Sequence, residues 1–368
     1  MRPLGALWEI VCEVKALVVV YVLLAIVLFS LLVLAHEFGH FITAKLSGVQ
    51  VNEFSLFMGP AIWKKQKGET LYALRCIPFG GYCAMEGEDG ENNNPRAFVN
   101  TKVWKRLMIL VAGAVMNFIV GFLILAIFLG IYTSVYRDGY MANKQVVDVL
   151  PDRTFAGQLL VGDEFYEING RRVFVQNDIT MLLDREADGI HDIVVIRDGE
   201  KVLLEQIVMR RDETDQKYGF STGWDTMNFG ILLKESWNQS LDAGRLTWMG
   251  LSDLITGRES VKNVAGPVGA VDMVVSTVNQ TDDTGFAILN IIYFFGFISI
   301  NLGVMNLLPS PALDGGRSVC LLVTAAAEKI FRRKINPKYE TYLHAGFMIL
   351  LLAFMAIVTF KDVWGLFK

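Results

Sequence analysis

Two histidines and a glutamate lie together at the end of the first apolar stretch of the chain. His36, Glu37 and His40 fit the pattern H-E-x-x-H. In a helix, histidines four residues apart share one face, so they can hold one metal ion while the glutamate beside them activates a water molecule. The pattern ends an uninterrupted apolar run, Ala16 to Ala35. Ionisable side chains at the end of such a run cost free energy, so we expect them to have a function. The alternative is that they are simply three polar residues where a helix leaves the membrane.

The composition is that of a membrane protein with a water-soluble insert. Of the 368 residues, 53% are hydrophobic, and they are clustered along the chain. The formal net charge of −4 gives no indication of nucleic-acid binding. The four cysteines form no C-x-x-C pair, so we interpret them as packing residues. The first apolar run is too long for the core of a signal peptide, and we expect it to be retained.

The chain is predicted to be a membrane α-helical protein with four transmembrane helices. Each contains about twenty apolar residues, enough to cross the hydrocarbon core. The four segments are residues 1–46, 105–133, 286–316 and 343–361. Lysines and arginines gather between the first and second segments and between the third and fourth, which places both connections in the cytosol. The metal motif then lies near the cytosolic side, and the long insert lies outside the cell.

The connections contain predicted β structure. Residues 47–104 are expected to form a membrane-associated β-hairpin region with a turn at Lys64 to Glu69 and a bend at Pro78 to Tyr82. An unpaired edge strand there could hold an extended peptide beside the metal, although a plain cytosolic hairpin fits the sequence equally well.

The insert is predicted to be a small α+β domain followed by a linker. The domain covers residues 140–212, with a hairpin around Asp198-Gly199. The linker, residues 213–285, contains an amphipathic helix at Trp237 to Leu254. The basic stretch 317–342 is expected to be a cytosolic loop.

Asp314 is the predicted third metal ligand. It is the sole acidic residue between Phe286 and Ala327, and it follows Pro309 and Pro311, which break a helix at membrane depth. A catalytic zinc ion needs three protein ligands and a water molecule, and Asp314 completes that set with the two histidines. Alternatively, Asp314 caps the helix that begins near the following glycines.

Other residues are weaker candidates for the third ligand. Leu46 occupies the position where a metzincin has its third histidine. Glu53 and Glu69 are in strand or turn sequence rather than on a helix. His191 and His344 are interpreted as structural.

Several motifs together resemble the site-2 protease family of intramembrane zinc metalloproteases, close to its bacterial RseP-type branch. The matching elements follow one another in the family's order over nearly the whole chain. They are HEFGHF with the following alanine (36–44), GVQVNEFS (48–55), IPFGGY (77–82), the GxxxN element (113–117), AGPVG (265–269) and NLLPSPALDGG (306–316). Arg317 departs from the family pattern, because many relatives have histidine after the double glycine.

The resemblance implies both a fold and an activity. The insert would be a single extracytoplasmic PDZ-like domain, and the protein would lie in the bacterial inner membrane. Its substrates would be single-span membrane proteins, such as anti-sigma factors or signal-peptide remnants, already shortened by an upstream site-1-type protease. Glu37 would be the catalytic base and Zn²⁺ the cofactor. The predicted substrate-binding residues are Asn306, Pro309, Pro311, Gly80 and Gly81.

Two other functions remain open on the residues alone. The first is a non-catalytic membrane adaptor that presents a PDZ-like domain and carries a structural metal, although structural zinc sites are normally closed by four Cys or His ligands. The second is a metal transporter, which should carry ionisable groups on several membrane helices.

Overall fold

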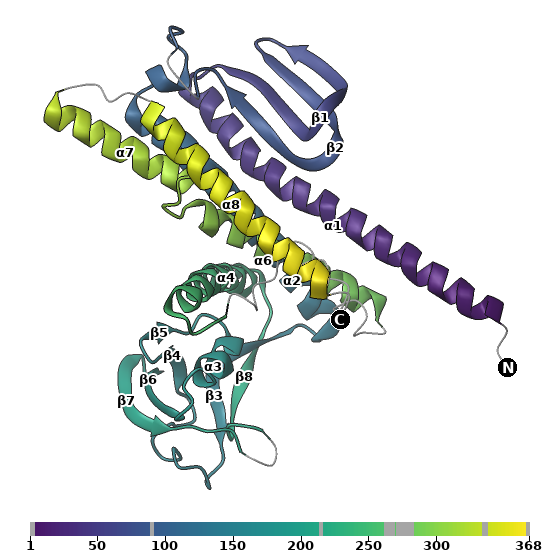
Figure 1. Cartoon of the computed structure of the whole chain (residues 1–368). Helices are drawn as coiled ribbons and strands as arrows, with labels where there is room; N and C mark the ends of the chain where they lie inside the picture. The colour runs from purple at the N-terminus through teal and green to yellow at the C-terminus, as the bar shows by residue number, and fades with distance from the viewer. Residues whose placement is uncertain are drawn as a thin grey trace. The chain divides into compact units, whose positions relative to one another are not determined.

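The computed structural model describes residues 4–88, 92–212, 216–260, 269, 283–332 and 338–365 (Figure 1). Four helices in these ranges are long and apolar enough to cross a membrane, as predicted. They are α1 (Leu4–Ser47), α2 (Val103–Tyr136), α6 (Thr284–Asn306) and α8 (Lys338–Gly365). The predicted AGPVG element lies outside the described residues, apart from Gly269.

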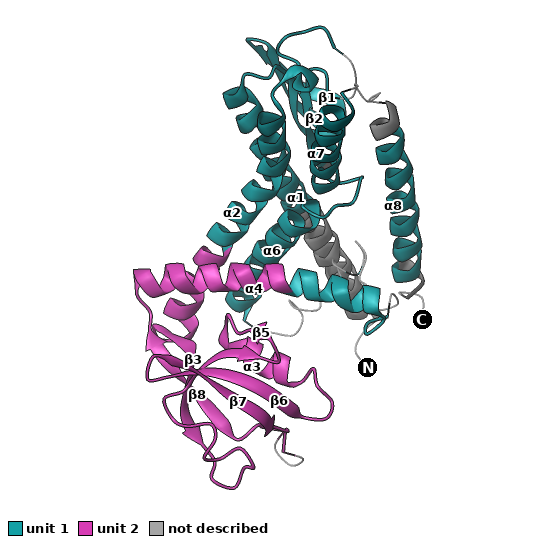
Figure 2. Ribbon diagram, turned by 90° about the vertical axis from the view of Figure 1, so that its left-hand side faces the viewer, with its two compact units in different colours: residues 1–124, 246–368 teal, residues 125–245 magenta. Residues whose placement is uncertain are grey.

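The chain divides into two compact units (Figure 2). The first contains residues 1–124 and 246–368, and the second contains residues 125–245. The H-E-x-x-H motif and the predicted third ligand both belong to the first unit, so that unit contains the candidate site.

The third apolar segment is interrupted between two helices. Helix α6 ends at Asn306, and α7 (Asp314–Phe331) begins after a non-helical connection that contains both prolines. Proline lacks a backbone N–H and cannot continue a helix, which explains the break. Residues 317–331, expected to be a loop, are helical. Positive charge was the basis of that expectation, but it carries no information on backbone conformation.

A β-sheet lies along the C-terminal half of α1 (Figure 1). Strands β1 (Val51–Lys67) and β2 (Thr70–Met85) are long and bent. Residues 51–56 pair with 81–85 on one side and with 71–74 on the other, and residues 61–67 pair with 70–75. The hairpin is confirmed, but its turn is tighter than expected, because β1 continues to Lys67. Row 81–85 is the edge of the sheet that approaches α1.

The second unit contains a mixed arrangement of strands and helices. Its sheet has the order β7-β6-β4-β3-β8, with β5 paired to β4. The strands are β3 (Tyr140–Val149), β4 (Glu164–Ile168), β5 (Arg171–Arg172), β6 (Ile190–Arg197), β7 (Glu200–Val208) and β8 (Phe220–Thr226). Helix α3 (Gln176–Leu183) contacts β3 and β4, and α4 (Phe229–Thr256) begins in this unit.

The predicted hairpin at Asp198-Gly199 is present, and both residues have positive φ, as a two-residue hairpin turn requires. The sheet extends beyond the expected boundary at residue 212, because β8 pairs with β3. The sequence of β8 contains glycine and few β-branched residues, so its pairing depends on β3 rather than on its own propensity. The predicted amphipathic helix is part of α4.

Helix α2 packs closely against both α1 and α6. A Cβ atom at Gly39 of α1 would fall on the backbone oxygen of Ala112. A Cβ atom at Gly303 of α6 would lie 2.8 Å from the backbone oxygen of Ala114, and one at Gly121 would lie 2.5 Å from Ile300 Cγ1. Small residues allow membrane helices to approach this closely, so dispersion contacts hold α2 between its neighbours.

We predict that Gly303→Leu destabilises this helix packing, because the added side chain meets the α2 backbone. Overpacking costs on the order of 1–3 kcal/mol. Gly346→Leu on α8 is the matched control, since a Cβ atom there meets nothing within 4 Å. Thermal unfolding in detergent should show a lower midpoint for the first variant only. Equal midpoints for both variants would contradict the described contact.

Candidate metal centre

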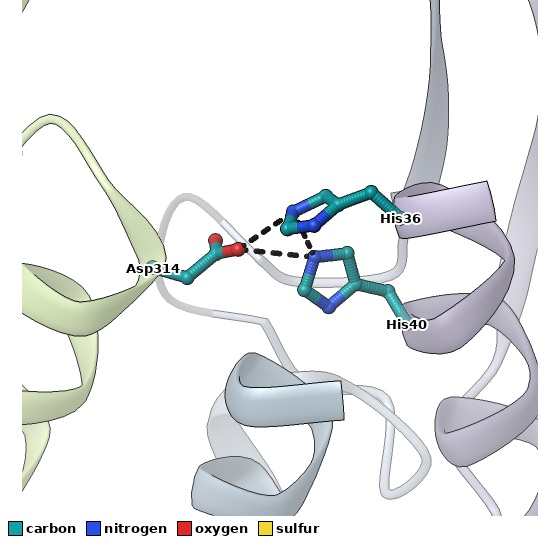
Figure 3. Close-up of side chains that lie close together, drawn as sticks. All are labelled: His36, His40 and Asp314. Carbon is teal, nitrogen blue, oxygen red and sulfur yellow. Dashed lines mark hydrogen bonds and ion pairs between the residues drawn. The ribbon is translucent and has the colours of Figure 1, made fainter. Parts of the chain in front are cut away.

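His36, His40 and Asp314 meet at one point (Figure 3). The His36 and His40 Nε2 atoms are 3.1 Å apart, and they lie 2.9 and 3.2 Å from Asp314 Oδ2. Ligands about 2.0–2.1 Å from a tetrahedral zinc ion would be separated by roughly 3.3 Å. Two imidazole nitrogens and a carboxylate oxygen at these separations fit such an ion, with one position left for water.

The two histidines come from one turn of α1, and Asp314 comes from the first turn of α7. Gly315 and Gly316 make the approach possible, because Cβ atoms there would fall on the backbone of Leu307 and Ser310. The connection after α6 therefore folds back tightly onto the start of α7. This close return brings a carboxylate to α1 from a position 278 residues away.

Helix α2 provides the floor of the site. A Cβ atom at Gly113 would lie 2.5 Å from His40 Nε2 and 2.6 Å from His36 Cε1, so only glycine leaves room for both rings. His40 Nδ1 lies 2.7 Å from the backbone oxygen of Ile109. A proton on Nδ1 donates to that oxygen, which leaves the Nε2 lone pair directed at the metal position.

Asp314 is largely buried, and its carboxylate faces the Nε2 atoms of both histidines. The carboxylate is the form that binds a metal ion. Asp314 is also the first residue of α7, so it stands at the helix start, as the alternative interpretation expected, but its side chain is directed at the histidines.

Glu37 is held by the edge of the sheet. Its Oε2 accepts a hydrogen bond of 3.0 Å from the backbone N–H of Cys83 in row 81–85. The carboxylate of the residue that follows His36 therefore contacts the backbone of β2. Sequence reasoning did not single out Cys83 or Ile109 for these contacts, because backbone groups carry no residue-specific signal.

The predicted substrate-binding residues have different surroundings. Asn306 reaches the centre, with its Nδ2 atom 3.4 Å from His36 Nδ1. Pro309 is exposed, and the backbone oxygen of Pro311 accepts a hydrogen bond from His344. Gly80 and Gly81 are buried where β2 approaches the edge row. A Cβ atom at Gly81 would lie 2.8 Å from the backbone oxygen of Ser55, so this position packs tightly inside the sheet.

The rejected third ligands are engaged elsewhere. Glu53 forms an ion pair with Arg75 at 2.6 Å. Glu69 binds Arg96 and Lys45, whose hydrogen bonds lower its pKa to about 2. Neither glutamate belongs to the group of three side chains that could hold a metal ion in the described part of the chain.

Comparison with known proteins shows the family of the chain. Peptidase family M50 matches residues 24–354 of the chain. A Fusobacterium nucleatum protein named "Putative zinc metalloprotease FN1322" is 32% identical over 94% of this chain and 99% of its own length. A Clostridium perfringens protein with the same kind of name is 34% identical over 93% and 98%. "Regulator of sigma-W protease RasP" of Bacillus subtilis is 26% identical over 93% and 98%. The chain belongs to peptidase family M50.

Proposed function

We propose that this protein is an intramembrane zinc metalloprotease that hydrolyses peptide bonds within or near the transmembrane segment of single-span membrane proteins. The observation that carries the proposal is the meeting of His36 and His40, on a helix of membrane-spanning length, with Asp314 at the start of α7. Membership of a peptidase family and the names of the similar zinc metalloproteases support both the reaction and the metal.

The chemistry is divided between the metal and Glu37. Zinc, when bound by His36, His40 and Asp314, supplies a Lewis acid that lowers the pKa of a water molecule and polarises the scissile carbonyl. Glu37 takes the proton of the attacking water and later delivers it to the leaving amine. The hydrogen bond from Cys83 keeps the Glu37 carboxylate oriented for that transfer.

The position of the site along α1 supports cleavage at membrane depth. His36 lies about three turns before the helix ends at Ser47, roughly 16 Å along its axis. The bilayer core is about 30 Å thick, so a centre at this position lies within the reach of a substrate's membrane segment. Both histidines are less than 10% exposed, and their surroundings come from α2 and α7.

An extended substrate would bind along row 81–85. The peptide groups of a transmembrane helix are hydrogen-bonded to one another, so the helix must unwind locally before water can attack a peptide bond. The unwound stretch can add to the edge of the sheet as a further strand, with its backbone groups paired beside Glu37. The Nδ2 atom of Asn306 lies 3.4 Å from His36 Nδ1, so its amide is close enough to the centre to contact the substrate. Residues that weaken helices in a substrate should therefore favour cleavage.

The second unit would act as an extracytoplasmic PDZ-like module. Its sheet with α3 against β3 and β4 is compatible with that fold, and the positive-inside rule supports the orientation. The protein would lie in the bacterial cytoplasmic membrane and act after an upstream site-1-type protease. The sigma-W regulator among its relatives supports anti-sigma factors as a substrate class, with signal-peptide remnants as another.

We predict that Glu37→Gln lowers the turnover rate by a factor of at least about 10² and leaves metal binding intact, because only the base is lost. His36→Ala should lose both. Cleavage of a single-span substrate and metal content per chain should be measured on the same samples. Full turnover by Glu37→Gln would show that Glu37 is not the catalytic base.

The backbone contact of Cys83 gives a separate prediction. Cys83→Pro removes the N–H that binds Glu37, whereas Cys83→Ala keeps it, and proline is tolerated where a strand's N–H faces away from the sheet. The proline variant should show a lower kcat with unchanged zinc content, and the alanine variant should behave like wild type. If the two variants cleave at the same rate, the contact does not orient the base.

A further inference from the structure

His36 differs from His40 in how its second ring nitrogen is bound. His40 Nδ1 faces a backbone oxygen, but His36 Nδ1 faces two side-chain amides. The Nδ2 atoms of Asn117 and Asn306 each lie 3.4 Å from it. If His36 binds metal through Nε2, its Nδ1 carries a proton and requires an acceptor. One of the two amides must therefore present its oxygen.

The Asn117 amide is the more deeply buried of the two. Its side chain is 1% exposed, and its Oδ1 atom is buried without a hydrogen bond in the described part of the chain. If the Asn117 amide nitrogen faced a protonated His36 Nδ1, two hydrogen-bond donors would face each other. Half a turn of the Asn117 amide replaces this opposition by a donor and an acceptor, with almost no change of shape.

The backbone around Asn117 is fixed. Ser299 of α6 donates a buried hydrogen bond of 2.8 Å to the backbone oxygen of Asn117. A Cβ atom at Gly303 would lie 3.5 Å from Asn117 Cβ, so α6 closes over this part of α2. Asn306, by contrast, is the half-buried last residue of α6, beside the break in the helix. The fixed amide suits a permanent contact, and the terminal amide suits a substrate.

Ile109, Gly113 and Asn117 follow one another at intervals of four residues, so they form one face of α2. The backbone oxygen of Ile109 orients His40, Gly113 leaves space for both rings, and Asn117 faces His36. One helix face thus contacts both histidine ligands. Of these three residues, only Asn117 makes its contact through side-chain atoms, because Ile109 acts through its backbone and Gly113 has no side chain.

We infer that Asn117 is a positioning residue of the metal centre, whose side-chain oxygen accepts a hydrogen bond from His36 Nδ1 and holds Nε2 toward His40 and Asp314. The inference rests on the proposed zinc site. Asn117 touches neither substrate nor metal, so its effect reaches the reaction through the orientation of His36. Loss of such an outer partner typically weakens metal binding by about 10- to 100-fold.

The test is zinc affinity of the full-length protein in detergent, measured by competition with a chromophoric chelator. Asn117→Leu keeps the approximate size and removes the acceptor, so it should weaken zinc binding by about 10- to 100-fold. Asn117→Asp restores an acceptor for Nδ1–H and should bind zinc within a few-fold of wild type. The visible spectrum of the cobalt-substituted protein should change for the leucine variant and return toward wild type for the aspartate variant.

Two matched controls separate the possible causes. Asn306→Leu removes the other amide near His36 and should leave zinc affinity nearly unchanged. Asn290→Leu replaces a partly buried amide elsewhere on α6 and should leave both affinity and spectrum unchanged. Wild-type affinity in Asn117→Leu, or an equal loss in Asn306→Leu, would overturn the inference.

A leucine variant that fails to fold leaves the aspartate variant to decide, since an aspartate that binds zinc no better than Asn117→Ala also overturns the inference. If the wild-type protein itself binds no zinc while His36→Ala behaves identically, the proposed function fails instead. The two failures are therefore distinct.

Discussion

The structure depends on satisfying ionisable side chains among apolar helices. His36 and His40 would be costly on α1 without partners, and Asp314 would be costly at the start of α7. Each removes that cost for the others, because the two Nε2 atoms and one carboxylate oxygen converge within hydrogen-bond distance. The close contacts of α2 with its neighbours and the folded connection after α6 serve this convergence.

Backbone atoms complete the site as much as side chains do. Glycines remove side-chain volume where helices and rings must approach, and the freed space brings backbone groups close enough to act. The oxygen of Ile109 orients one histidine, and the N–H of Cys83 holds the Glu37 carboxylate. The proposed metal ligands and base come from α1 and α7, and the sheet edge that contacts Glu37 belongs to β2.

Much of this arrangement could be predicted from the sequence, because residue type and spacing carry the relevant physics. The length of the apolar segments predicted the four long helices. The H-E-x-x-H spacing predicted that both histidines share one helix face, and the isolated position of Asp314 after two prolines predicted that it is the third ligand. Other features depend on tertiary contacts. The strand at Phe220–Thr226 forms through pairing with β3. The helix at residues 317–331 was not predicted, because the basic residues there were interpreted as a loop. Contacts of backbone atoms, such as that of Cys83, leave no signal in residue identity.

We propose that the protein, with one zinc ion held by residues from α1 and α7, cleaves peptide bonds at membrane depth. The most direct test of this proposal uses the purified protein reconstituted in liposomes with a single-span substrate, and mass spectrometry to identify the bond that is broken. The account predicts cleavage within or next to the substrate's membrane segment, lost after metal removal and restored by one equivalent of zinc. Cleavage confined to the soluble part of the substrate, or persisting in metal-free protein, would contradict it.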